Sequence, residues 1–278
     1  MSDVVREQVR LALEKMDSKM PTWLEENKEP QFEYIERGNE GPTVVMLHGL
    51  FGALSNWDSI LPLMEKYARC IALHFPILTG HNSEVKVKAL AAFAEYFIRS
   101  KNLDKVILCG NSLGGHVALR VALASPELVE MLVLSGSSGL YEHTADTLPV
   151  RPNEKFIRDH MKRVFYSDEF ITDAAVNEIL SILSKRSNHL NLIHAARSAK
   201  KDNLQKILNQ VQAPTLLLWG ENDEVTTLEV ARIFESLIPD AKLATVAGCG
   251  HAPMIEHPEW FAEQVQLFFK SKLTAPQK

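Results

Sequence analysis

Cysteine is scarce in this chain of 278 residues, which contains only Cys70, Cys109 and Cys249. So small and odd a number does not provide the disulfide framework on which small secreted domains depend. Cys70 and Cys109 lie inside apolar runs, where a small core residue is typical and a disulfide pair is not. This usage favours a reducing compartment, and we expect a cytoplasmic protein.

Long hydrophobic runs are missing as well. The first 20 residues carry charges throughout, so they do not contain the apolar core of a signal peptide. No other window reaches the length of uninterrupted apolar sequence that a membrane-spanning helix requires. The sequence therefore predicts that a membrane is not a partner.

An excess of positive charge is the third absence. Lysine and arginine total 30 against 35 aspartate and glutamate residues, a formal net charge of -5. This charge gives no stripe of basic residues that could follow the phosphate backbone of a nucleic acid, so we expect no nucleic-acid partner. The 46% share of hydrophobic residues is ample for a large core at this length, so folding needs neither disulfides nor a metal.

Short apolar runs alternate with helical stretches along most of the chain. The expected strands are 31–37, 43–47, 70–73, 106–109, 131–134, 215–219 and 242–246. The expected helices are 57–66, 85–100, 115–124, 227–238 and 260–270. Continuous apolar runs are typical of strands buried on both faces, and their alternation with helices predicts an α/β fold with a doubly wound, mostly parallel sheet.

Residues 141–210 interrupt this alternation, because they show helical patterns and no convincing strand. The sequence thus predicts a core domain, residues 1–140 and 211–278, with a helical cap inserted at 141–210. Residues 1–30 are predicted to form an N-terminal helical extension. We expect this helix to pack on its own core, with docking or a homodimer as the alternative.

The strongest chemical signal is the run Gly110-Asn111-Ser112-Leu113-Gly114-Gly115, which follows an expected buried strand and precedes an expected helix. This is the context of a nucleophile elbow, in which a strained turn presents a serine hydroxyl at a helix N-terminus. The amide of Leu113 is then the natural first donor of an oxyanion hole. A glycine-rich turn that binds phosphate or simply packs is the alternative, although no Gly-Lys-Ser/Thr of a P-loop follows.

A serine hydroxyl is a weak nucleophile near neutral pH and needs a base. Of ten histidines, His251 is the best placed, since it follows the last expected strand in a glycine-rich loop. An acid is expected between serine and histidine in the chain, and Asp223 lies just past the strand 215–219. Glu221 and Glu224 compete with it for this role. The sequence therefore predicts a triad of Ser112, Asp223 and His251.

The second oxyanion donor is expected in the loop after the strand 43–47. There Gly49 permits a turn that aims the Leu50 amide at the developing charge, and Phe51 is either the alternative donor or a wall of the pocket. We expect His48 to brace this loop rather than to act as a base.

Together these motifs resemble the α/β-hydrolase superfamily, from about residue 31 onward. The elbow and the helical insertion resemble its capped branch, which includes meta-cleavage product hydrolases, enzymes that cut carbon–carbon bonds in vinylogous diketo acids, and small-ester hydrolases. The resemblance implies that Asn111 is the family's elbow asparagine, which we predict to contact substrate. It also implies that Arg186 occupies about the position at which the family has a carboxylate-binding arginine. The alternative, for Arg186 and Arg197 alike, is a solvated charge on a helix.

Some positions depart from the carbon–carbon hydrolase pattern. Ala252 replaces the tryptophan that usually follows the catalytic histidine, and the oxyanion loop has fewer glycines. We therefore expect a serine hydrolase that cleaves a small-molecule carboxylic ester through an acyl-enzyme, without a metal or cofactor. A carbon–carbon hydrolase is one alternative, and a non-enzymatic small-ligand receptor on the same fold is the other. The apolar residues of the insertion, such as Phe156 and Ile179, either face the substrate or pack the cap onto itself.

Overall fold

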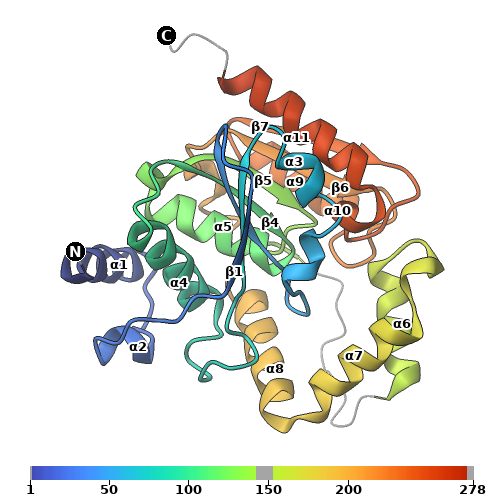
Figure 1. The fold of residues 1–278 in the computed structure, drawn as a ribbon, viewed down its shortest axis with the longest axis horizontal. Helices are drawn as coiled ribbons and strands as arrows, with labels where there is room; N and C mark the ends of the chain where they lie inside the picture. Colours follow the sequence, from blue (N-terminus) through green and yellow to red (C-terminus); the bar gives the residue numbers. More distant parts are fainter. Residues whose placement is uncertain (1, 142–152, 274–278) are drawn as a thin grey trace.

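In the computed structural model, which describes residues 2–141 and 153–273, a seven-stranded sheet forms the centre of the molecule (Figure 1). Its strands are β1 (Tyr34–Arg37), β2 (Thr43–Leu47), β3 (Arg69–Leu73), β4 (Val106–Asn111), β5 (Val129–Ser135), β6 (Thr215–Gly220) and β7 (Ala241–Val246). The spatial order is β1-β3-β2-β4-β5-β6-β7, with β1 antiparallel to β3 and all other pairs parallel. The predicted fold class and all seven predicted strands are confirmed.

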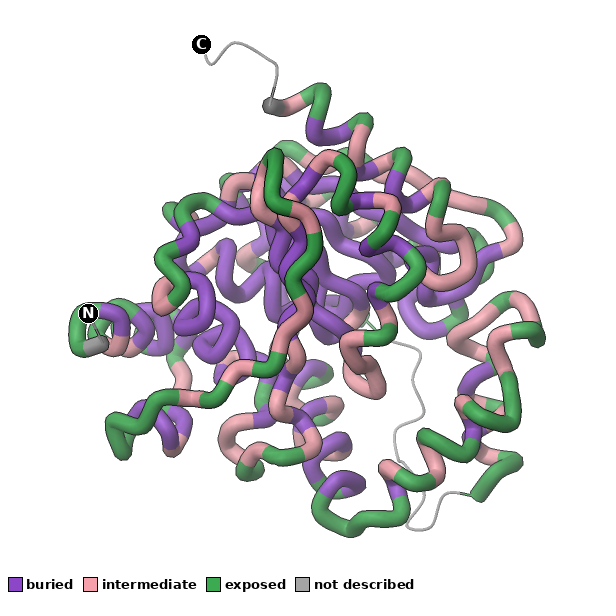
Figure 2. Tube along the Cα trace, viewed as in Figure 1, coloured by how far each residue is buried: buried purple, intermediate pink, exposed green. Residues whose placement is uncertain are grey.

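The strand residues alternate between two cores, one on each face of the sheet. Val45 and Leu108 pack with α4 (Val87–Ser100), α5 (Leu113–Ala124) and α9 (Leu228–Leu237). Their neighbours Val44 and Ile107 pack with α3 (Leu61–Met64) and α11 (Pro258–Leu273) on the other face. Burial on both faces is why these strands are apolar throughout, and Figure 2 shows the buried chain concentrated at the sheet and its flanking helices.

Helix α1 (Ser2–Lys15) packs on the domain by its apolar side, as predicted. Val5, Val9 and Leu13 are buried in the core that α4 and α5 also join. The Lys15 ammonium donates a hydrogen bond to the Ala124 carbonyl at the end of α5, at 2.8 Å. A short helix, α2 (Thr22–Glu25), follows and buries Trp23.

The predicted helix 57–66 is wrong in its extent. The structure has a 3₁₀ turn, η1 (Leu54–Trp57), and then the single-turn α3, which begins at Leu61. The reason is Pro62, which has no backbone N–H and is tolerated in the first turn of a helix but not in its interior. The helix therefore starts beside the proline instead of running through it.

Among the described residues between β5 and β6 there are three α-helices: α6 (Glu154–Val164), α7 (Asp173–Ser184) and α8 (Arg186–Lys201). We call them, with the 3₁₀ turn η3 (Asp168–Phe170), the inserted helices; they lie together beside the sheet in Figure 1. Residues 142–152 of the predicted cap lie outside the described residues, and the domain division stays a prediction.

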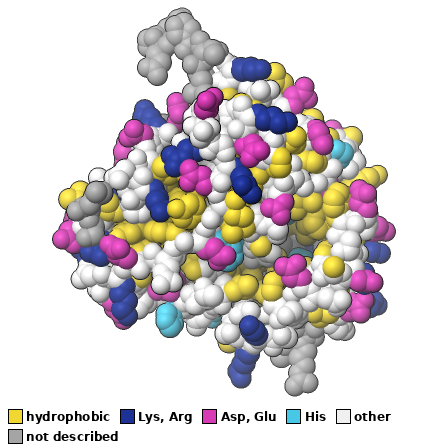
Figure 3. Space-filling view, viewed as in Figure 1, with side chains coloured by type: hydrophobic (Ala, Val, Ile, Leu, Met, Phe, Trp, Pro, Cys, Tyr) yellow, Lys and Arg dark blue, Asp and Glu magenta, His cyan; other side chains and the backbone are white. Residues whose placement is uncertain are grey.

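The surface carries charges of both signs. On the face drawn in Figure 3, basic and acidic side chains are interspersed rather than gathered by sign. In the part of the chain that the structure describes, no helix is long and apolar enough to cross a membrane. The remaining helix, α10 (Pro253–Glu256), follows the His251 loop and leads into α11.

Candidate active site

Ser112 occupies the turn between β4 and α5 in a strained backbone conformation. Its φ of 54° and ψ of -118° lie where a residue other than glycine is rarely found. The glycines on either side permit this turn, since a Cβ at position 110 would lie 2.4 Å from the Gly114 carbonyl oxygen. The Ser112 amide donates to the Ser135 carbonyl oxygen at 3.0 Å, which anchors the turn to β5. The local geometry is that of a nucleophile elbow.

The absence of a side chain at position 114 also brings the elbow against the end of β2. A Cβ there would lie only 1.9 Å from the Leu47 carbonyl oxygen, so only glycine allows this approach. The following loop consequently lies beside the serine: a Cβ on Gly49 would be 3.2 Å from the Ser112 Cβ. Leu50 and Leu113, the predicted oxyanion donors, line the same cavity as Ser112.

His48 braces this loop, as the sequence indicated. The Phe75 amide donates to its Nε2 at 2.9 Å, so the proton is on Nδ1, which donates to the Gly49 carbonyl oxygen at 2.8 Å. Burial lowers the pKa of His48 to about 4. The imidazole is therefore neutral near pH 7, and both ring nitrogens are used in fixing the loop.

His251 and Asp223 meet at the carboxyl end of the sheet. The His251 Nδ1 lies 2.8 Å from the Asp223 Oδ2, and both residues are buried. Asp223 is itself held by the amides of Val225 and Thr226, which donate to its Oδ1 at 2.8 and 2.9 Å. A carboxylate fixed in this way holds the imidazole in one orientation and tautomer.

The neighbouring carboxylates are placed differently. Glu221 is exposed and accepts a hydrogen bond from the Thr245 hydroxyl at 3.0 Å, and Glu224 is also exposed. Among the three acids of this loop, Asp223 is the one that the structure brings to His251.

Sequence reasoning missed two residues that position His251. The Thr226 hydroxyl donates to the Asp223 Oδ2 at 3.0 Å and lies 3.3 Å from the His251 Nδ1. Gly136 follows β5 with a φ of +49°, and a Cβ on it would lie 2.8 Å from the His251 Nδ1. The only available signal for Gly136 was a glycine directly after a buried strand, which does not identify its neighbour.

Ser112 and His251 open into one cavity of about 320 Å³ beneath the inserted helices. Asn111 and Phe51 line it, together with five apolar residues between β5 and β6: Phe156, Phe165, Phe170, Ile179 and Leu183. These five side chains therefore line the cavity, and they also pack, since Leu183 is part of the core and Phe165 stacks on Phe170.

Two of the predicted substrate contacts are less direct than expected. The Asn111 side-chain amide donates to the backbone carbonyl oxygens of Ser135 and His251, both at 3.1 Å, so it ties the elbow to the histidine loop. Arg186 is exposed at the start of α8 and is not among the described residues that line the cavity. The orientation of α8 directs Ala196 and Ala199 to the cavity instead.

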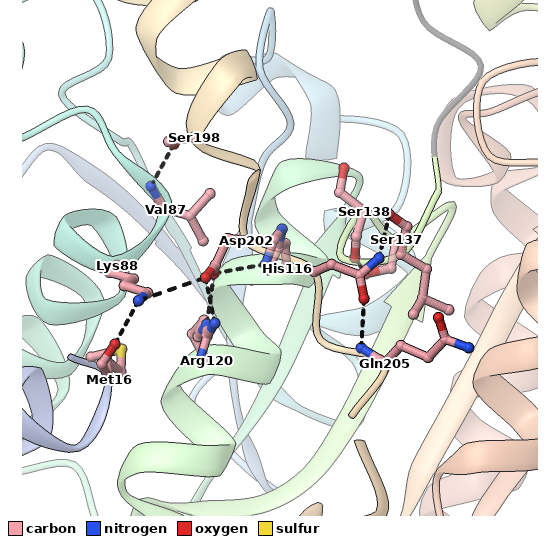
Figure 4. Close-up of polar contacts among 12 residues, drawn as sticks. Met16, Val87, Lys88, His116, Arg120, Ser137, Ser138, Ser198, Asp202 and Gln205 are labelled. Atoms are coloured by element: carbon pink, nitrogen blue, oxygen red, sulfur yellow. Dashed lines mark hydrogen bonds and ion pairs between the residues drawn. The ribbon is translucent and has the colours of Figure 1, made fainter. Parts of the chain in front are cut away.

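The end of α8 is fixed to the helix that begins at the elbow (Figure 4). Asp202 caps α8, and its carboxylate accepts hydrogen bonds from the Arg120 Nε at 2.7 Å and a second, shorter one from the Arg120 Nη2. It also pairs with the His116 Nε2 at 3.1 Å. Since His116 and Arg120 belong to α5, this cluster joins an inserted helix to the helix that begins directly after Ser112.

One more polar side chain, His160 of α6, faces the cavity. Its ring lies 5.8 Å from the Phe51 ring and 6.3 Å from the Phe156 ring, measured between centroids. Burial lowers the pKa of His160, and the charges of Arg163 and His251 lower it further. Within residues 2–141 and 153–273, no group of three or more potential ligands is arranged to hold a metal.

Comparisons with known proteins agree with this geometry. A family model described as "Alpha/beta hydrolase family" matches residues 44–264. The chain is 30% identical to 2-hydroxy-6-oxo-6-(2'-aminophenyl)hexa-2,4-dienoic acid hydrolase of Metapseudomonas resinovorans, covering 86% of this chain and 87% of the relative. It is also 30% identical to the pimeloyl-[acyl-carrier protein] methyl ester esterase of Nitrosomonas europaea, over 82% of this chain and 96% of that one.

A solved structure resembles the whole arrangement. MGS-MChE2, an alpha/beta hydrolase enzyme from the metagenome of lagoon sediments at Mar Chica, Morocco, superposes with a TM-score of 0.72. It is 34% identical, and the match covers 88% of this chain and 97% of that one.

Proposed function

Because this chain belongs to the alpha/beta hydrolase family and is a hydrolase, we propose that it cleaves carboxylic esters of small molecules through an acyl-enzyme on Ser112. The observation that carries this proposal is the placement of Ser112 and His251 on one cavity, with the His251 Nδ1 2.8 Å from the buried Asp223 carboxylate. Its two relatives at 30% identity are both named as enzymes, a hydrolase and an esterase, which argues against the receptor alternative.

Each step of the reaction uses a group of this chain. The Ser112 oxygen attacks the ester carbonyl carbon while its proton passes to the His251 Nε2. The resulting oxyanion accepts hydrogen bonds from the Leu50 and Leu113 amides. Collapse of the intermediate breaks the carbon–oxygen bond, and His251 protonates the departing alcohol. Water, deprotonated by His251, then attacks the acyl-enzyme and releases the carboxylic acid and Ser112.

The charge of the cavity favours an ester over a dienoic acid. The described residues that line it include no lysine or arginine, and Glu178 adds negative charge at its edge. A substrate carboxylate enclosed there would have no cationic partner among these residues, which is costly in a desolvated site. The Metapseudomonas relative keeps carbon–carbon cleavage as the second candidate, but Arg186 does not supply the missing charge.

Turnover of two substrate types tests this choice. We expect p-nitrophenyl butyrate to be hydrolysed with a kcat/KM at least about 100-fold above that for a 2-hydroxy-6-oxohexa-2,4-dienoate, because the unpaired carboxylate costs several kcal/mol. Ser112→Ala should lower kcat for the ester by roughly 10⁶-fold and leave the melting temperature unchanged. A faster reaction with the dienoate would establish carbon–carbon cleavage instead.

A further inference from the structure

Among the described residues of the inserted helices, His160 is the only histidine that lines the cavity. It lies on the apolar side of α6, whose other cavity-lining residues are Phe156, Ile157, Met161 and Val164. Its ring is parallel to that of Phe156 within 13° and meets the edge of Phe51 at 64°. The imidazole thus has two aromatic neighbours, Phe156 from its own helix and Phe51 from the loop after β2.

The ring nitrogens of His160 have no protein partner among the residues that the structure describes. The buried imidazoles of His48 and His116, by contrast, are hydrogen-bonded, His48 to the backbone and His116 to Asp202. A polar group enclosed by apolar side chains is costly unless it is hydrogen-bonded. An occupant of the cavity that carries a hydrogen-bonding group would satisfy it.

The surroundings determine the charge of that group. Burial, Arg163 and His251 all lower the pKa of His160, so the imidazole is neutral at pH 7 and offers one donor and one acceptor. Glu178, at the cavity edge, disfavours an anion. A hydroxyl, ketone or amide fits these conditions better than a carboxylate or a plain alkyl chain.

We propose that His160 is a specificity-determining residue that hydrogen-bonds a neutral polar group of the substrate, which makes the natural substrate an ester carrying a hydroxyl, keto or amide function apart from the scissile bond. This inference rests on the proposed ester hydrolysis at Ser112. It assigns to α6 a role in substrate recognition that the nucleophile, base and oxyanion donors do not provide.

Matched ester pairs test the proposal. Each pair compares an alkyl ester with an ester of equal length in which one methylene is a ketone, placed along the acyl chain in one series and along the alcohol in another, with acid release measured by a pH indicator. For at least one position, the wild type should prefer the keto ester in kcat/KM by about tenfold, the worth of one hydrogen bond.

Two variants separate recognition from packing. His160→Phe keeps the aromatic contacts with Phe51 and Phe156, so it should fold, and it should bring the keto-to-alkyl ratio of kcat/KM close to one. His160→Gln retains a donor and an acceptor and should restore part of the preference. His194→Phe, on α8 and outside the residues lining this cavity, is the control and should change nothing. An unchanged keto-to-alkyl ratio in His160→Phe at every position would overturn the proposal.

A binding measurement keeps this test independent of turnover. Unreactive amide analogues of each pair are titrated calorimetrically into Ser112→Ala with and without His160→Phe. If the wild type hydrolyses no ester, the proposed function fails, yet a keto preference in binding that is lost with His160 still supports its role in recognition. Equal binding of both analogues in both proteins contradicts that role.

Discussion

At the scale of single residues, the elbow depends on side chains that are absent. Gly110, Gly114 and Gly49 allow three backbone segments to approach Ser112 closely, and each would meet a neighbour if it carried a Cβ. The strained φ of Ser112 persists because β4, β5 and α5 fix the chain on both sides of it. The motif spacing was sufficient to predict this part of the site, because the turn leaves the sequence few other choices.

The acid of the site gives a prediction at this scale. Asp223→Asn should lower kcat by roughly 10⁴-fold, because an amide can favour the wrong imidazole tautomer while keeping its position. Glu221→Gln, two residues away in the same loop but exposed, should keep kcat within about twofold, since surface charges contribute little. Steady-state ester hydrolysis measures both variants. Equal losses in the two would mean that Asp223 does not orient His251.

At the scale of secondary-structure elements, the Asp202 cluster holds α8 on α5. Burial alone would raise the pKa of Asp202, but hydrogen bonds and charges from His116 and Arg120 outweigh it and hold that pKa well below its ordinary value. Lys88 of α4 lies 3.8 Å from the same carboxylate. Since Ala196 and Ala199 of α8 line the cavity, this cluster fixes one cavity wall relative to Ser112.

We predict that Asp202→Asn lowers the free energy of unfolding by about 3 kcal/mol at pH 7, because the nearly buried Arg120 loses its opposite charge. Asp240→Asn, which breaks the exposed pair with Lys272, should change it by about 0.5 kcal/mol or less. Urea denaturation measures both. A loss no larger for Asp202 than for Asp240 would show that the cluster does not stabilise the fold.

The stabilisation that Asp202 contributes should depend on pH. The folded-state pKa of Asp202 lies below its ordinary value of 3.8, so the stabilisation is fully present above about pH 5. It is lost as the pH falls below 4 toward the lowered pKa, where the folded carboxylate takes up its proton. The difference between wild type and Asp202→Asn in unfolding free energy should therefore shrink on acidification. A constant difference from pH 7 to pH 3 would contradict this linkage.

The elements also show why some predictions failed. Strands buried on both faces are continuous apolar runs, so their positions follow from local sequence. The inserted helices are amphipathic, and nothing local specifies how each is turned toward the cavity. Arg186 is exposed and outside the described cavity lining, which matches the alternative of a solvated helix charge, while His160 of α6 lines the cavity. The sequence signal for His160 is a histidine on the apolar side of a helix, between Ile157 and Met161. The predicted helix 57–66 is wrong in its extent because Pro62 is not tolerated in the interior of a helix.

At the scale of the whole molecule, a rigid sheet presents the serine, acid and histidine from three different strands at one edge, as expected for α/β folds. The inserted helices line a cavity at this edge with mostly apolar side chains, as small-molecule sites commonly are. Under the proposed function, the core supplies the chemistry and the inserted helices supply the selectivity. A change of substrate range would accordingly need substitutions in α6, α7 or α8 rather than in the sheet.

Covalent labelling of the nucleophile tests the central claim most directly. The folded wild type is treated with an alkyl fluorophosphonate, and the intact mass and peptide map are recorded. We expect one phosphonyl group per chain, on Ser112, and none on Ser112→Ala. In His251→Gln, which lacks the base, the reaction should be strongly slowed. A folded wild type that remains unlabelled, or that is labelled on another residue, would contradict the claim.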